Sequence, residues 1–465
     1  MGARGKGRAK TALASPPAFS LAVLAVALAA WYFNHSCKGV LEEEVAVTLG
    51  PIPPFLRPRA SLEQQQPLLD IVYVSAFPSH LRSSLRSLCH FFDGGAGLGS
   101  VHLVVPDRMV AYFESSLPQL QCPAGQRAHA LAFRVWGESS LIPAFTQAAP
   151  YKGTLRQMTL KLAAATIVGS PFYLVMDSDV YARRPFGVGD LLLQGEAGKA
   201  LRARTGLDQL DFSQPSSWFR DSARLLQTPL VADTDAYCAA APGGGAPAWF
   251  AATGNATPPA QAPFALLPVV DPRERGGAGS GRQVYGACRN GRGHATHVTP
   301  MVLSAELVKD VLFPRLEAAA AAGGAAGSPW YAALLNYQAS REAQCWQGVF
   351  EGLGLAQRFY SWTEYSLYFV AGVASAALDQ YHAFPASGGI TSYKYSLMLP
   401  QAYDAADWDA TFLDAGDSAP FFIVHSWFNK PLQHTNARLA KYIPSLAAEE
   451  EGEAKVPVPS ALPLY

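Results

Sequence analysis

Apolar and polar positions along the chain form blocks that favour strands and helices in turn. Short apolar runs rich in β-branched residues favour buried strands. Four such runs lie in the first half of the chain, at 69–76, 101–107, 130–136 and 172–176. Between them, apolar residues recur at the three- and four-residue spacing of amphipathic helices over 80–92, 109–116 and 154–168. Strands that alternate with helices predict a mostly parallel sheet with helices on both faces.

The pattern weakens after residue 190. Residues 239–282 are rich in Ala, Gly and Pro and show little periodicity, so we expect a mobile low-complexity insertion there. Another strand is expected at 421–425, and residues 446–465 resemble a disordered tail. The ordered domain is therefore predicted to cover residues 67–445.

The first residues differ from the rest of the chain. Residues 1–17 carry four basic side chains and no acidic one, and residues 18–33 form an apolar run that ends in three aromatic residues. This pattern predicts a membrane anchor that follows a cytosolic tail, although a cleaved signal peptide is the alternative. Residues 34–66 then read as a stem. We therefore expect a single-pass type II protein of the Golgi membrane, with its catalytic domain in the lumen.

Composition and charge narrow the classes of function. The chain has 465 residues, of which 49% are hydrophobic, enough to form a sizeable core. Thirty-six basic residues balance 36 acidic ones. This neutral balance argues against nucleic acid as a partner, because nucleic-acid binding needs a basic face.

The six cysteines all lie beyond the apolar run, and their even number permits disulfides. The sequence does not determine their pairing, and unpaired buried thiols are the alternative. No Cys or His spacing suggests zinc.

The most informative motif follows the apolar run at 172–176. Asp177 and Asp179 stand one residue apart, directly after this predicted strand. Ligands bind at the carboxyl ends of strands in open α/β sheets. Two neighbouring carboxylates repel each other, and a divalent cation such as Mn²⁺ or Mg²⁺ would compensate their charge. The motif therefore predicts a metal site that binds a diphosphate.

At this point the sequence resembles nucleotide-sugar glycosyltransferases of the GT-A class, in which an Asp-x-Asp motif closes a central strand. The residues that carry a closer resemblance, to an uncharacterised family of predicted glycosyltransferases, are Gln157, Lys161, the segment 173–179, Arg184-Pro185, the segment 363–365 and Tyr368. The resemblance implies an α/β fold with a GT-A-like, Rossmann-type mixed sheet flanked by helices. It also implies a nucleotide-sugar donor and a glycan or glycoprotein acceptor.

The resemblance implies donor contacts as well. In GT-A enzymes the first strand and the loop after it hold the nucleotide, which here points to Ser75, Ala76 and Phe77. Ser178 lies within the metal motif and is expected beside the donor. Because Gln157 and Lys161 are four residues apart, they share one helix face, and Lys161 is expected to contact the diphosphate, with Arg156 as a substitute. A solvated helix face is the alternative.

The late segment from His425 to Lys430 resembles the distal His and Lys-Pro element of family-eight glycosyltransferases, although its spacing is shorter. This resemblance implies His425 as a third metal ligand and Lys430 as a contact of the diphosphate. A structural, hydrogen-bonded histidine is the alternative.

Acceptor-side residues are expected in two segments. Glu364 is a candidate general base for the acceptor hydroxyl, with Trp362 and Tyr365 beside it as sugar-binding residues. Helix capping and core packing are the alternatives for this group. His297 is placed on the acceptor side too, where residues 297–301 are expected to begin a helix.

Two other functions are compatible with the sequence. The motif at Asp177 matches the nucleophile motif of phosphohydrolases of the haloacid-dehalogenase type, but that motif normally ends the first strand. The other alternative is a non-catalytic lumenal binding protein.

Overall fold

The computed structural model of the chain describes residues 67–93, 97–122, 131–146, 151, 153–194, 201–205, 216–227, 265–269, 282–286, 299–346, 362–375, 377–383, 389–392, 396, 403, 406–424 and 432–449. The chain divides into two units. One consists of residues 1–48 and 336–359, and its described part is the end of helix α10 (Trp330–Trp346). The other consists of residues 49–335 and 360–465 and contains all other elements described below.

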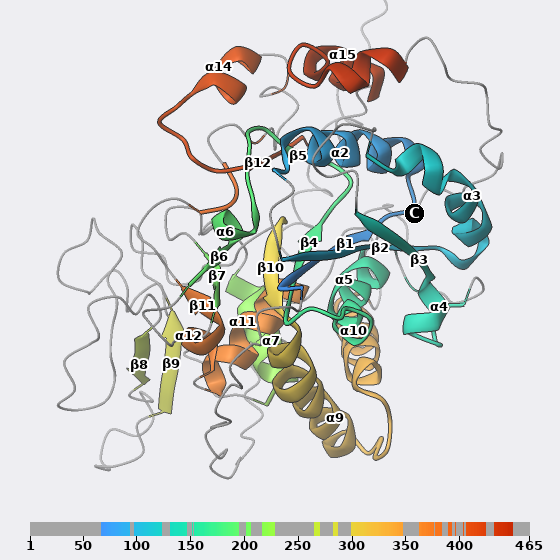
Figure 1. Cartoon of the computed structure of the whole chain (residues 1–465). Coiled ribbons are helices and arrows are strands. Elements are labelled where there is room, and N and C mark those ends of the chain that lie inside the picture. The colour runs from blue at the N-terminus through green and yellow to red at the C-terminus, as the bar shows by residue number, and fades with distance from the viewer. Residues whose placement is uncertain are drawn as a thin grey trace, which may run out of the picture. The chain divides into compact units, whose positions relative to one another are not determined.

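A five-stranded sheet forms the centre of the larger unit (Figure 1). Its strands, in spatial order, are β10 (Met301–Ser304), β4 (Phe172–Met176), β1 (Leu69–Val74), β2 (Leu98–Val105) and β3 (Ala132–Gly137). The last four pair in parallel, whereas β10 pairs antiparallel with β4. Every residue of β1 and β4 is buried, as expected for strands that are covered on both faces.

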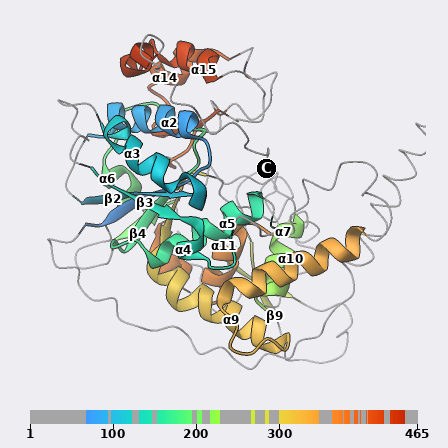
Figure 2. The same ribbon diagram turned by 90° about the vertical axis from the view of Figure 1, so that its right-hand side faces the viewer.

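Helices cover both faces of this sheet (Figures 1 and 2). Helices α2 (Pro78–Phe91) and α3 (Val110–Leu120) lie over one face, and α5 (Gly153–Ala163) and α11 (Glu364–Ala374) lie on the other. Helix α2 buries the apolar stripe of Leu81, Leu85 and Leu88, which are four and three residues apart. The predicted α/β fold, with a mixed sheet flanked by helices, is confirmed.

Shorter elements complete the described residues. The further helical elements are η1 (Asp107–Met109), α4 (Glu138–Leu141), η3 (Ala164–Thr166), α6 (Val188–Leu191), α7 (Ser216–Leu225), the π-helical η5 (Leu307–Leu312), α9 (Phe313–Ala322) and α12 (Leu378–Tyr381). Three small sheets are formed by β5 (Val180–Ala182) with β12 (Phe421–Ile423), by β6 (Leu192–Leu193), β7 (Arg202–Arg204) and β11 (His382–Ala383), and by β8 (Ala265–Val269) with β9 (Arg282–Gly286). The last elements are α14 (Trp408–Leu413), α15 (Leu432–Leu439) and η8 (Pro444–Glu449).

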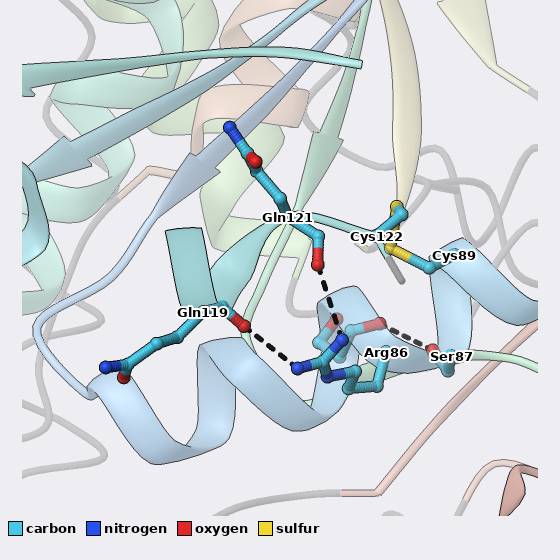
Figure 3. Close-up of a disulfide and its surroundings, with 7 residues drawn as sticks. Arg86, Ser87, Cys89, Gln119, Gln121 and Cys122 are labelled. Carbon is cyan, nitrogen blue, oxygen red and sulfur yellow. Dashed lines mark hydrogen bonds between the residues drawn. A yellow bond between two sulfur atoms is a disulfide. The ribbon is translucent and has the colours of Figure 1, made fainter. Parts of the chain in front are cut away.

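A disulfide between Cys89 and Cys122 joins the end of α2 to the residues that follow α3 (Figure 3). Arg86 strengthens the same junction, because its guanidinium donates hydrogen bonds to the backbone carbonyls of Gln119 (2.9 Å) and Gln121 (3.3 Å). The expectation of disulfides is confirmed for this pair.

Three local predictions differ from the structure. Residues 301–304 form strand β10 and not part of a helix, because these four buried residues pair with the open edge of β4. The predicted insertion 239–282 contains strand β8 and reaches the start of β9, so part of it has regular structure. The predicted tail begins inside η8, where Leu446 is only 1% exposed and packs into an apolar cluster.

The predicted localisation is corrected. In the part of the chain that the structure describes, no helix has the length and apolar character needed to cross a membrane. The expected cytosolic tail, anchor and stem at 1–66 lie outside the described residues. We therefore do not retain the assignment to the Golgi membrane with a lumenal domain.

Candidate functional site

The path of the chain through the sheet creates a switch point between β1 and β4. The chain adds β2 and then β3 on one side of β1, and afterwards returns to place β4 on the other side. Tyr73 pairs with Met176 in the parallel register, so Ser75 and Asp177 follow at the same edge. The crevice outside the carboxyl ends of the strands at such a point is where open α/β sheets bind ligands.

Asp177 is held in place by three residues, two on helix α5 and one in the segment before β10. Its carboxylate accepts a hydrogen bond from Gln157 Nε2 at 2.9 Å. The ammonium of Lys161, one helical turn further along α5, lies 2.8 Å from Oδ1 and 3.1 Å from Oδ2. The backbone N–H of Asp177 donates to Thr299 Oγ1 at 3.1 Å. The side chain nevertheless stays 19% exposed, so its carboxylate is accessible at the sheet edge.

Lys161 bridges two carboxylates. Its Nζ also lies 2.8 Å from Glu364 Oε1, at the start of α11. Lys161 and Glu364 are 4% and 3% exposed. Burial by itself lowers the pKa of Lys161, but the charges of Asp177 and Glu364 raise it well above the ordinary value. Lys161 is therefore a permanent cation that lies between two carboxylates.

Asp179 lies in the turn between β4 and β5. Asp179 is only 9% exposed, and its backbone carbonyl accepts a hydrogen bond from the N–H of Val424 at 2.9 Å. Ser178, between the two carboxylates, is half-buried. The pairing of β12 with β5 thus brings the residue before His425 next to the Asp-x-Asp motif.

The residues after β1 lie at the same edge. Ser75 is 7% exposed, and its Oγ accepts a hydrogen bond from the N–H of Phe77 at 3.1 Å. Ala76 is half-buried. The Phe77 ring is 47% exposed and lies 5.9 Å from the ring of His80, between centroids. An exposed aromatic surface therefore stands beside the switch point.

Other predicted site residues lie elsewhere or are covered. Arg156 is buried, forms an ion pair with Glu138 and donates to the carbonyl of Phe145 at 3.1 Å, so it is not directed at Asp177. Trp362 and Tyr365 are 0% and 5% exposed, which leaves no open ring face for a sugar. The Tyr365 ring instead lies 5.5 Å from Lys161 Nζ.

The expected role of Glu364 needs a correction. A general base must reach the acceptor hydroxyl, whereas the Glu364 carboxylate is buried and paired with Lys161. We therefore do not assign it as the base. His297, His425 and Lys430 lie outside the described residues.

Among the described residues, few side chains are available as ligands for a divalent cation. No group of three or more His, Cys, Asp or Glu side chains among them could hold a metal ion. The two carboxylates of the Asp-x-Asp motif still suit Mg²⁺ or Mn²⁺, because such ions often take one or two protein carboxylates together with phosphate oxygens.

Sequence reasoning missed two features of this site. Thr299 was not a candidate, although it binds the backbone of Asp177 across 122 positions. The partnership of Lys161 with Glu364 spans 203 positions. No local sequence signal marks either contact.

Several solved structures of glycosyltransferases are similar to this chain over part of their length. The glycosyltransferase GlyE of Streptococcus pneumoniae TIGR4 is 13% identical, with 25% of each chain covered and a TM-score of 0.16. The apo form of GlyE is also 13% identical, with 32% of each chain covered and a TM-score of 0.19. The galactosyltransferase LgtC, in complex with donor and acceptor sugar analogues, gives 12% identity, 34% of this chain, 52% of LgtC and a TM-score of 0.20.

The chain thus spans between a quarter and about half of the solved structures that it matches. The α/β fold class follows from the strand order and strand pairing of the central sheet. No curated protein matches the chain. Residues 81–242 and 278–447, which are most of the sequence, match the profile described as "Family of unknown function (DUF6492)", and the chain belongs to that family.

Proposed function

We propose that this protein is a metal-dependent glycosyltransferase that moves a sugar from a nucleotide-sugar donor to a glycan or glycoprotein acceptor. The observation that carries the proposal is the position of Asp177 and Asp179. They stand at the carboxyl end of the buried strand β4, beside the end of β1, at the switch point of the sheet.

The two carboxylates would hold Mn²⁺ or Mg²⁺. When bound there, such a cation stabilises the negative charge that develops on the departing nucleoside diphosphate. The protein's part is to orient the ligands. Gln157 and Lys161 hold the Asp177 carboxylate from the side of α5, and Thr299 holds its backbone. Such fixed geometry lowers the reorganisation that charge stabilisation requires.

The end of β1 would receive the nucleoside. Ser75 Oγ binds the backbone N–H of Phe77, which fixes the turn into α2. The exposed ring of Phe77 offers a flat apolar face, and aromatic faces of this kind stack on nucleobases. Ala76 and Ser178 follow the ends of β1 and β4, are half-buried, and would lie on the donor side.

We retain His425 as a third metal ligand and Lys430 as a contact of the diphosphate. Support comes from Val424, whose N–H binds the Asp179 carbonyl at 2.9 Å. Val424 is the residue directly before His425 in the sequence. His297 keeps its proposed place on the acceptor side on sequence grounds alone.

A donor screen tests this function. The full chain is incubated with Mn²⁺ and a panel of nucleotide-sugars, and release of nucleoside diphosphate is measured with and without glycan acceptors. Asp179→Asn should lower the rate by at least ~10²-fold, as expected for loss of a charge-stabilising group. Asp310→Asn, at an exposed site on η5, is the matched control and should leave it unchanged.

The outcomes separate the possible functions. Metal-dependent release of nucleoside diphosphate supports the proposal. Release of inorganic phosphate from phosphomonoesters, lost in Asp177→Asn, would indicate a phosphohydrolase. Neither activity, with nucleotide binding intact, would indicate a binding protein.

A further inference from the structure

Three charged side chains form a line from the interior to the sheet edge. Glu364 is 3% exposed, Lys161 is 4% exposed, and the Asp177 side chain is 19% exposed. Lys161 Nζ lies 2.8 Å from Glu364 Oε1 and 2.8 Å from Asp177 Oδ1. The three come from α11, α5 and the end of β4, and α5 and α11 lie on the same face of the sheet (Figure 2).

The sum of charges at this edge depends on Glu364. Asp177 and Asp179 together carry two negative charges, which match a divalent cation. Lys161 by itself would cancel one of them and would repel a cation at the same edge. With Glu364 paired to Lys161, the ammonium is neutralised from its inner side, so it offsets the charge of Asp177 less.

Glu364 also gives Lys161 a permanent partner. The oxygens of Asp177 that accept from Lys161 and Gln157 are the same oxygens that a metal ion would use. If those oxygens bound a cation instead, Lys161 would lose the Asp177 carboxylate as its counter-charge. Without Glu364 the buried ammonium would then be unpaired, and an unpaired buried charge costs much free energy. The Glu364 carboxylate is too buried to serve as the ligand itself.

We infer that Glu364 is a positioning residue of the proposed metal site. It acts through Lys161: it neutralises the ammonium from its inner side and leaves the Asp177 carboxylate its negative charge toward a divalent cation. This inference rests on the proposed function, since it assumes that the Asp pair binds a metal ion.

The test measures binding of Mn²⁺ alone to the full chain, without nucleotide, by calorimetry or by electron paramagnetic resonance of free Mn²⁺. Glu364→Gln keeps the shape of the side chain and leaves the Lys161 charge uncompensated. Affinity for Mn²⁺ should fall by ~10–100-fold, the effect of one unit charge near a divalent ion in a partly screened site. The double variant Lys161→Met/Glu364→Gln removes both charges and should bind Mn²⁺ more tightly than Glu364→Gln.

A second buried pair provides the matched control. Glu138 is 6% exposed and pairs with Arg156, so Glu138→Gln makes the same chemical change in a similar environment. It should lower the melting temperature but leave Mn²⁺ affinity unchanged. Recovery of Mn²⁺ affinity in the double variant would show that Glu364 acts by cancelling the charge of Lys161. If Glu364 were needed only for folding, changing a second buried residue would not restore Mn²⁺ affinity.

The variant Asp179→Asn tests the metal site separately from the role of Glu364. If Asp179→Asn binds Mn²⁺ as well as the wild type, the metal site is misplaced, and both the proposed function and the role of Glu364 are overturned. If Asp179→Asn abolishes binding but Glu364→Gln binds normally, only the role of Glu364 is overturned. The same holds if the double variant binds as weakly as Glu364→Gln.

Discussion

Asp70, at the amino end of β1, offers a test of how buried polar groups stabilise this fold. Asp70 is 3% exposed, and its carboxylate accepts hydrogen bonds from the backbone N–H groups of Ser100 (2.7 Å), Gly169 (2.8 Å) and Ser170 (3.1 Å). His102 Nε2 lies 3.5 Å from the same carboxylate. These contacts tie the start of β1 to β2 and to the residues before β4.

The orientation of His102 is set from its other side. Trp136 Nε1 donates a hydrogen bond to His102 Nδ1 at 3.1 Å, so Nε2 carries the ring hydrogen and faces Asp70. Burial by itself raises the pKa of Asp70, but the neighbouring His102 ring and the backbone hydrogen bonds from Ser100 and Ser170 outweigh it. The pKa of Asp70 falls from 3.8 to about 2.

The lowered pKa has a defined effect on stability. A carboxyl group whose pKa is lower in the folded state stabilises the protein above its unfolded pKa, and this contribution is lost as the pH falls through the folded pKa. The shift of Asp70 corresponds to about 2 kcal/mol. About 1 kcal/mol of this should disappear between roughly pH 5 and pH 3, and the rest as the pH approaches about 2.

Urea unfolding of the wild type and Asp70→Asn at several pH values measures the effect. The difference in unfolding free energy should be largest at neutral pH and should shrink as the pH falls from about 5 toward 2. Glu114→Gln, at an exposed position of α3, is the control and should show no such trend. A difference between wild type and Asp70→Asn that is constant over this pH range would refute the reasoning.

Three further changes should lower stability. Loss of the Cys89–Cys122 disulfide, which closes a separation of 33 residues, should cost about 4 kcal/mol by chain entropy; equal urea midpoints for the oxidised and reduced protein would contradict this. Gly99→Ala should cost at least ~1 kcal/mol in the same assay, because its Cβ would overlap the Asp70 carboxylate, and a neutral result would mean that the carboxylate can move. Arg183→Met should cost at least ~2 kcal/mol, since the guanidinium is 1% exposed and donates to backbone carbonyls before β12; an unchanged melting temperature would count against that role.

The parallel core of this protein follows from local patterns in the sequence. The apolar runs that begin at Leu69 and Phe172 are rich enough in β-branched and aromatic residues to predict strands that are buried on both faces. Helix α2 follows from the spacing of its leucines. The acidic pair of Asp177 and Asp179 is visible because it directly follows such a run. Each of these signals lies within a few residues, where backbone geometry links sequence to structure.

Tertiary structure decided which side chains meet. Residues 301–304 are too few for periodicity to separate strand from helix, and the free edge of β4 settled the choice. Glu364 reads as an accessible base in the sequence, but α11 packs beside α5 and buries it against Lys161 across 203 positions. Charge compensation depends on distance and burial in space, and neither quantity is encoded locally. The sequence alone therefore identified the Asp pair, and only the fold revealed that Lys161 lies between Asp177 and Glu364.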